Sequence, residues 1–207
     1  VKGGKVTPEQ AAVYGQFLAQ RFAKKSNIIW LNGGDVRGTE GGEVWEVLGK
    51  TIKQYDPHHL MTFHPRGRTA SSDWFQNEPW MDFNMVQSGH RRYDQDTSKN
   101  ETKHYGEDNW KFIETDLKLK PLKPTIDGEP SYEHIPQGLH DPKEIRWAPE
   151  DVRRYGYWSV FAGGADVCGW QCACTLHDLS LEHSADILCL VALPCCGGSD
   201  GSPAPAD

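Results

Sequence analysis

Apolar and polar positions alternate along the chain in two patterns, one with the spacing of a helix and one typical of a buried strand. The first helical pattern begins at the capping box Thr7-Pro8-Glu9-Gln10, and its apolar positions lie three or four residues apart at Tyr14, Phe17, Leu18 and Phe22. A continuous apolar run at 28–31 follows and indicates a strand at about 27–31. Continued along the chain, the two patterns predict helices at about 8–25, 43–55, 108–119 and 149–161, and strands at about 27–31, 60–63, 81–89 and 124–128.

Helices that alternate with short apolar strands imply parallel strands joined by crossover helices. Two α/β architectures fit this order, the doubly wound sheet and the (β/α)8 TIM barrel. No predicted strand is followed by a GxGxxG or Walker glycine pattern, which weakens a nucleotide-binding doubly wound sheet. We therefore favour the barrel. Only four or five of its eight βα units are visible, so the chain is expected to hold the C-terminal half, about strands 4–7/8.

Each of the four predicted strands ends in a polar cluster: NGGD, HPRGR, QSGHRR and DGEPSYE. In a barrel, the C-terminal ends of all strands share one mouth, where active sites lie. The side chains expected at this mouth are Asp35, His64, Arg66, Gln87, His90, Asp127, Glu129, Tyr132 and Glu133.

Two carboxylates on separate strands suggest glycoside hydrolysis, in which one acid donates a proton to the leaving oxygen and the other, ionised, attacks carbon or activates water. Asp35 and Glu129 are the candidates, and Asp127, two residues before Glu129, is the main rival. A Gly-Asp pair after a strand is also typical of a turn, so Asp35 by itself has a structural interpretation. Four arginines either pair with these acids or, as a cluster, suit an anionic sugar such as a uronate: Arg66, Arg68, Arg91 and Arg92.

Composition narrows the function classes. The chain has 207 residues with 37% apolar content, enough to bury a core, and a net charge of −7. No Lys or Arg follows Arg154, and no basic stripe of the kind that nucleic acid requires is present. No apolar run reaches the 18 residues that would predict a membrane span. The chain begins at Val1 with no leader, so we expect either a signal peptide that has been removed or a missing N-terminus.

All six cysteines lie near the C-terminus, at positions 168, 172, 174, 189, 195 and 196. Three interpretations stay open for this region: a zinc site with His177 or His183, native disulfides, or a tail that is no native structure. The low-complexity end CCGGSDGSPAPAD is expected not to pack.

Several long stretches are similar to one enzyme family: NIIWLNGGD, HLMTFHPRGRTASSDWFQNEPWMDFNMVQSGHRRYDQD, YGEDNW, KPTIDGEPSYEHIPQGLHD and DVRRYGYWSVFAGG. Together they resemble the catalytic domain of glycoside hydrolase family 140, whose apiosidase-like members occur mostly in gut Bacteroidetes. The resemblance covers about residues 7–165. It implies a TIM barrel that cleaves the bond between apiose and the galacturonic-acid backbone of rhamnogalacturonan II, a pectin, and it implies export to the periplasm, cell surface or medium.

The resemblance also assigns roles to residues. It implies Asp35 as the acid/base at the end of strand four and Glu129 as the nucleophile at the end of strand seven, in a retaining mechanism that requires no metal or cofactor. Substrate contacts are expected from Asn32, His64, Arg66, Trp74, Gln87, His90 and Tyr132. The acidic pectin is the expected partner.

After AGG the chain departs from the family pattern, because DVCGWQCACTLHD replaces the sequence of strand eight. We therefore expect a partial catalytic domain at 1–165 and a divergent tail at 166–207, disordered or produced by a frameshift. Because an incomplete barrel leaves strand edges and apolar faces uncovered, our hypothesis is that this chain alone is inactive. Two alternatives stay open: a retaining glycosidase for another plant polysaccharide, and a non-catalytic carbohydrate-binding or misassembled product.

Overall fold

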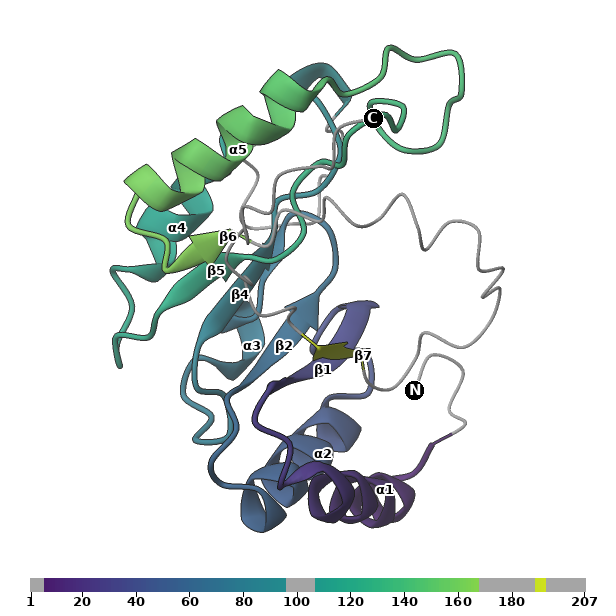
Figure 1. The fold of residues 1–207 in the computed structure, drawn as a ribbon, viewed down its shortest axis with the longest axis vertical. Coiled ribbons are helices and arrows are strands. Elements are labelled where there is room, and N and C mark those ends of the chain that lie inside the picture. Colours follow the sequence, from purple (N-terminus) through teal and green to yellow (C-terminus); the bar gives the residue numbers. More distant parts are fainter. Residues whose placement is uncertain (1–5, 96–106, 168–188, 193–207) are drawn as a thin grey trace, which may run out of the picture.

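The computed structural model describes residues 6–95, 107–167 and 189–192 as a mixed α/β structure (Figure 1). Its parallel strands are β1 (Ile28–Val36), β2 (Met61–Pro65), β4 (Asn84–Gln87), β5 (Thr125–Asp127) and β6 (Asp166–Val167). Its helices are α1 (Pro8–Phe22), α2 (Gly42–Tyr55), α3 (Ser72–Phe75), α4 (Trp110–Asp116) and α5 (Pro149–Phe161), with a 3-10 turn η1 at Tyr93–Gln95. In Figure 1 the helices lie along one side of a curved layer of strands.

The parallel strands lie in space in the order in which they occur in the sequence. β1 pairs with β2, while β4 pairs with β5 and β5 with β6. Side by side in the fold, β2 and β4 are linked where Thr62 Oγ1 donates to the carbonyl of Phe83 over 2.7 Å. A doubly wound sheet would reverse its strand order part-way. The described strands show no reversal, which argues against that alternative.

Two short antiparallel strands complete the sheets. β3 (Thr69–Ala70) pairs with β4, and β7 (Cys189–Ala192) pairs with the outer edge of β1. Neither segment was predicted to be a strand. The tail at 166–207 is described only at β6 and β7, so its zinc and disulfide interpretations lie almost wholly outside the described residues.

Most predicted elements are confirmed, and α5 has the bounds expected from its spacing. The prediction for β1 was wrong at its end, because this strand continues through NGGD to Val36. The register against β2 shifts between Gly33 and Val36, and the bulge residues Gly33, Gly34 and Asp35 have positive φ angles of 87°, 132° and 50°. A Cβ on Gly33 would lie 2.7 Å from the backbone carbonyl oxygen of His64 and 2.7 Å from the ring of Phe63. Only glycine therefore fits this close approach of two backbones.

Two apolar clusters hold the layers together. The larger one joins α1 and α2 to β1 and β2 through side chains such as Trp30, Trp45, Leu48 and Phe63. The smaller one packs α4 on β4 through Val86, Phe112 and Ile113. The helical faces therefore bury one side of the strands and leave the carboxyl ends of the strands to form a site.

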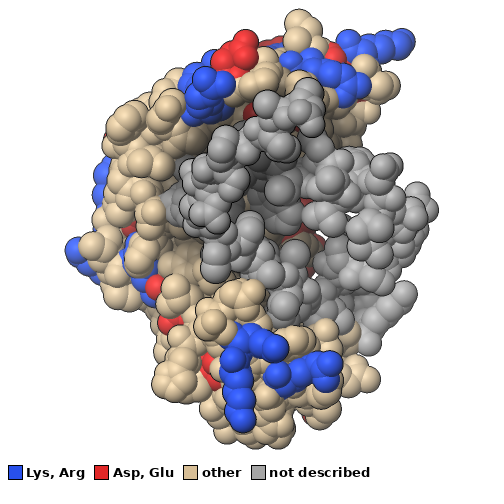
Figure 2. Space-filling model, viewed as in Figure 1, with Lys and Arg blue, Asp and Glu red and all other residues tan. Residues whose placement is uncertain are grey.

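The described surface carries mixed charge. On the face shown in Figure 2, the coloured Lys and Arg side chains form separate groups rather than one stripe. Among the described helices, none is long and apolar enough to cross a bilayer.

Candidate active site

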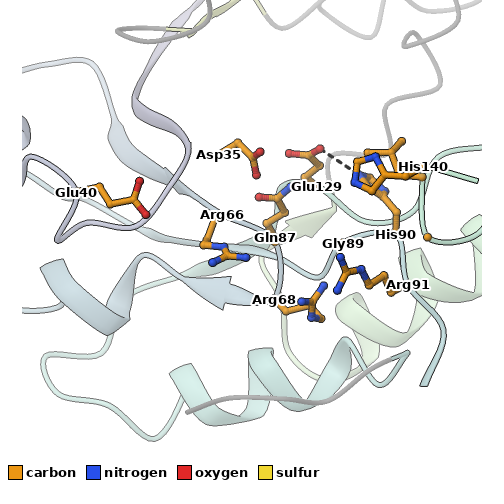
Figure 3. Close-up of a pocket in the computed structure, with 13 residues that line it drawn as sticks. Asp35, Glu40, Arg66, Arg68, Gln87, Gly89, His90, Arg91, Glu129 and His140 are labelled. Atoms are coloured by element: carbon orange, nitrogen blue, oxygen red, sulfur yellow. Dashed lines mark hydrogen bonds and ion pairs between the residues drawn. The ribbon is translucent and has the colours of Figure 1, made fainter. Parts of the chain in front are cut away.

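One cavity of about 390 Å³ opens at the carboxyl ends of β1, β2, β4 and β5 (Figure 3). Four polar strand ends that are far apart in the sequence therefore meet, as the sequence analysis expected. The predicted residues that line it are Asp35, Arg66, Gln87, His90 and Glu129. The other described lining residues are Glu40, Gly67, Arg68, Gly89, Arg91, Gly138, Leu139 and His140.

Glu129 is the most strongly held of these side chains. Its Oε2 lies 2.9 Å from His64 Nε2, and its Oε1 accepts from Tyr132 Oη at 2.6 Å and lies 3.2 Å from His90 Nε2. Burial acts to raise the pKa of Glu129, but the hydrogen bonds from His64, His90 and Tyr132 outweigh it and hold that pKa well below its ordinary value. The low pKa favours the ionised carboxylate, which is the form that acts as a nucleophile or as a general base.

His64 connects Glu129 to the strand that carries Asp35. The backbone N–H of Asp35 donates to His64 Nδ1 over 3.2 Å, so this nitrogen carries no proton. The hydrogen-bond pattern thus assigns the neutral tautomer with its proton on Nε2, directed at Glu129. One imidazole fixes the positions of two segments that lie far apart in the sequence.

Asp35 occupies the bulge of β1 and is exposed to solvent. Its φ of 50° lies in the left-handed region, which Asp and Asn adopt more readily than other non-glycine residues. In Figure 3 the carboxylates of Asp35 and Glu129 face the same space. An exposed acid on the bulge therefore faces a carboxylate that three hydrogen-bond partners hold.

Comparison with known proteins identifies a family and two similar structures. The sequence model of one family, described as "Apiosidase-like, catalytic domain", matches residues 2–170. The chain belongs to the apiosidase-like family. A search of curated proteins found no match.

Two solved structures are similar to this apiosidase-like chain. One is titled a glycoside hydrolase, with a TM-score of 0.76, 54% identity, and coverage of 80% of this chain and 38% of that chain. The other is titled a glycoside hydrolase of family 5 from Bacteroides vulgatus, with a TM-score of 0.77, 54% identity, and coverage of 80% and 36%. The chain is therefore glycoside hydrolase-like in sequence and fold, and it spans less than two fifths of these relatives.

Four residues expected to contact substrate do not line the cavity: Asn32, His64, Trp74 and Tyr132. Asn32 is fully buried; its amide donates to the carbonyl of Trp45 over 2.8 Å, and its Oδ1 accepts from Gly33 N. Trp74 packs edge-on against Phe63 with ring centroids 6.2 Å apart. The structure gives both side chains a supporting position around the β1 bulge, and the expected substrate contacts of Asn32 and Trp74 gain no support from it. Tyr132 and His64 reach the site through Glu129.

Asp127, the rival of Glu129, points into the protein. It is fully buried and accepts hydrogen bonds from Ser88 Oγ at 2.7 Å and Asn109 Nδ2 at 3.0 Å, with Ser159 Oγ at 3.4 Å. Burial raises the pKa of Asp127 despite these donors. This carboxyl group ties β5 to the end of β4 and to α4 and α5, and it has no route to a substrate.

Three further lining residues were not predicted from the sequence: Glu40, Leu139 and His140. Glu40 follows the β1 bulge, and the other two lie far along the loop after β5, where no periodic pattern marks them. The neighbouring Gly138 was the one available signal of a turn. No group of three or more His, Cys, Asp or Glu suited to a metal occurs in the described part of the chain, and the prediction that no metal is needed stays a prediction.

Proposed function

We propose that this chain is the C-terminal part of a (β/α)8 barrel that hydrolyses a glycosidic bond with retention, using Glu129 as nucleophile and Asp35 as acid/base. The observation that carries the proposal is the contact of His64, His90 and Tyr132 with the Glu129 carboxylate, which holds its pKa low beside a cavity that Asp35 also lines. A nucleophile must be ionised at the pH of the reaction, whereas the acid/base must exchange protons. The two environments differ accordingly: three hydrogen-bond partners surround Glu129, whereas Asp35 is exposed to solvent.

In the proposed reaction, Glu129 attacks the anomeric carbon while Asp35 gives its proton to the departing oxygen, so the glycosidic bond breaks as the ester bond to Glu129 forms. Asp35 then accepts a proton from water, and the hydroxide adds to the same carbon and releases Glu129. His64, His90 and Tyr132 hold the attacking carboxylate in place. Two displacements return the product to the configuration of the substrate.

The proposed substrate is the apiose–galacturonic acid linkage of rhamnogalacturonan II. Support comes from membership of the apiosidase-like family and from Arg66, Arg68 and Arg91, which line the cavity. Guanidinium groups bind carboxylates with paired hydrogen bonds, which suits an acidic sugar backbone. Because such a polymer lies outside the cell, we infer that the protein is exported.

We further propose that the 207-residue chain alone is inactive. The strands β1, β2, β4, β5 and β6 lie in sequential order, as the strands of part of a barrel would, and this chain covers only 38% and 36% of the two similar structures. Apolar side chains also stay exposed on the outer helices, as at Phe17 of α1 and Phe161 of α5, where the exposed fraction is 55% and 83%. Such faces are normally covered by neighbouring helices.

The test compares the full-length encoded protein with the 207-residue chain on a rhamnogalacturonan II oligosaccharide. We expect apiose release by the full-length protein only, and NMR of the first product should show retained configuration. Glu129→Gln should abolish release, while the matched carboxyl-to-amide change Asp127→Asn should retain most of it. Inverted product, or an active Glu129→Gln variant, would overturn the mechanism. Hydrolysis of a different plant polysaccharide would overturn only the substrate.

A further inference from the structure

The loop after β5 contains a hairpin over residues 134–147, which we call the rim hairpin. Its two arms are joined by backbone hydrogen bonds from His134 to Trp147, from Trp147 to Ile135 and from Gln137 to Ile145, at 2.9–3.0 Å. Pro136 and Arg146 form a β-bridge between the arms. The rim hairpin therefore has regular backbone pairing, and the orientation of its tip is set by that pairing.

The rim hairpin is anchored to the loop that carries His90. The buried Trp147 donates from Nε1 to the carbonyl of His90 over 3.0 Å, and the backbone N–H of Gly138 donates to the same carbonyl over 2.6 Å. Arg92 reaches both arms, donating to Gln137 at 2.6 Å and to Glu144 at 3.0 Å. Because His90 also bonds Glu129, the tip of the hairpin has a fixed relation to the proposed nucleophile.

Leu139, at this tip, combines an unusual backbone conformation with a side chain that lies outside the core. Its φ is 75°, a conformation that a bulky residue rarely adopts and that costs free energy. It is 40% exposed and belongs to neither apolar cluster of the fold. It is also the only aliphatic side chain among the described residues that line the cavity. Core packing therefore does not account for a leucine at this position.

We infer that Leu139 is a specificity-determining residue, which packs against the C–H face of the sugar ring that Glu129 attacks. This inference rests on the proposed function. In the view of Figure 3 Glu129 is drawn between Asp35 and His140, and Leu139, the sequence neighbour of His140, also lines the cavity. The leaving group departs beside Asp35. The ring captured by Glu129 is thus the part of the substrate nearest to Leu139, and ligand sites combine such apolar contacts with directional polar ones.

The test uses Leu139→Gly and Leu139→Ala in the full-length protein. Both remove the apolar contact, and we expect KM to rise roughly tenfold with kcat changed by less than about twofold. Glycine accepts a positive φ without strain, so Leu139→Gly should melt at a higher temperature than Leu139→Ala. The matched control is His134→Gly, because His134 has a φ of 64° in the same rim hairpin and its side chain is absent from the cavity lining. It should leave KM unchanged.

Two substrates locate the contact. An aryl glycoside of the released sugar has no polymer backbone, so a raised KM for both it and the oligosaccharide supports the inference. An unchanged KM for both, or a raised KM for the oligosaccharide alone, overturns it.

Failure of the proposed function gives a different result. In that case the wild-type protein does not hydrolyse either substrate, and the inference is then decided by oligosaccharide binding to Glu129→Ala, with and without Leu139→Gly. A roughly tenfold weaker dissociation constant in the double variant supports the contact, and equal or absent binding overturns it.

Discussion

His64 Nε2 lies 2.9 Å from Glu129 Oε2 and, because His64 Nδ1 accepts from the backbone of Asp35, it donates to Glu129 as a neutral imidazole. One side chain on β2 therefore positions the proposed nucleophile on the β5 side and the proposed acid/base on β1. A substrate-binding role, expected from the sequence, would have left these two nitrogens available for sugar hydroxyls.

The first prediction concerns the pH dependence of hydrolysis. Glu129 must be ionised to attack the sugar. Of the interactions that lower the pKa of Glu129, the hydrogen bond with His64 contributes most. His64→Ala should raise this pKa and move the acid limb of kcat/KM to higher pH, in addition to lowering the rate. The profile of kcat/KM from pH 3 to pH 8 measures the effect, with His134→Ala as the control. An acid limb that stays in place would contradict the assigned hydrogen bond.

The second prediction separates chemistry from strain at Asp35. Asn tolerates the left-handed conformation that Asp35 adopts, whereas Ala does not. Asp35→Asn should lower kcat by about a hundredfold to ten-thousandfold with little change in stability. Asp35→Ala should lose the same activity and also about 1 kcal/mol of unfolding free energy. Denaturant unfolding and kcat, measured on both variants, give the comparison. Equal stability of the two would show that the bulge relaxes.

The third prediction contrasts the pH dependence of stability at two acids. The pKa of Glu129 is lowered on folding, so its ionisation stabilises the protein above its unfolded pKa near 4.5, and this contribution is lost as the pH falls. The pKa of Asp127 is raised, so the stabilisation from its protonated form is complete below about pH 3.8 and is lost as the pH rises through the folded pKa. The unfolding free energy lost in Glu129→Gln should therefore grow toward neutral pH, and that lost in Asp127→Asn should shrink.

Urea unfolding of wild type and both variants at a series of pH values tests this contrast. The comparison of each variant with wild type cancels the groups that the two share. Parallel pH curves for the two substitutions would mean that the buried and the cavity-lining acid do not differ in environment as described.

The helices and the gathering of polar strand ends could be predicted because each follows from local spacing. α5 has a clear start at Pro149 and an apolar spacing that fixes its length, and the four strand-end clusters meet because parallel strands share an edge. The bulge could not be predicted, since it arises where β1 shifts register against β2, a contact between distant segments. Gly33 and Gly34 signalled a turn instead.

Individual side-chain roles were less predictable than their location. Trp and Asn side chains often bind sugars, but they also serve structural roles. Here Trp74 packs against Phe63, and Asn32 donates a hydrogen bond to the buried carbonyl of Trp45. Leu139 could not be predicted as a site residue, because its side chain has no polar group and its positive φ is known only from the structure. Asp127 and Glu129 are two residues apart, so the strand pattern predicts that both side chains face the same side. In the structure Asp127 is fully buried, whereas Glu129 lines the cavity.

The last prediction concerns the packing behind Glu129. Gly128 has no room for a side chain, because a Cβ there would lie 1.9 Å from Met85 Cε and 2.8 Å from Met85 Cγ. Met85 is itself buried on β4, so Gly128→Ala must displace either this side chain or β5. We expect a loss of about 1–3 kcal/mol of unfolding free energy, together with a lower kcat because Glu129 is the next residue. Adding Met85→Ala removes the clash, so the double variant should recover much of the kcat lost in Gly128→Ala. A double-variant cycle with no recovery would mean that the glycine is required by the backbone and not by Met85.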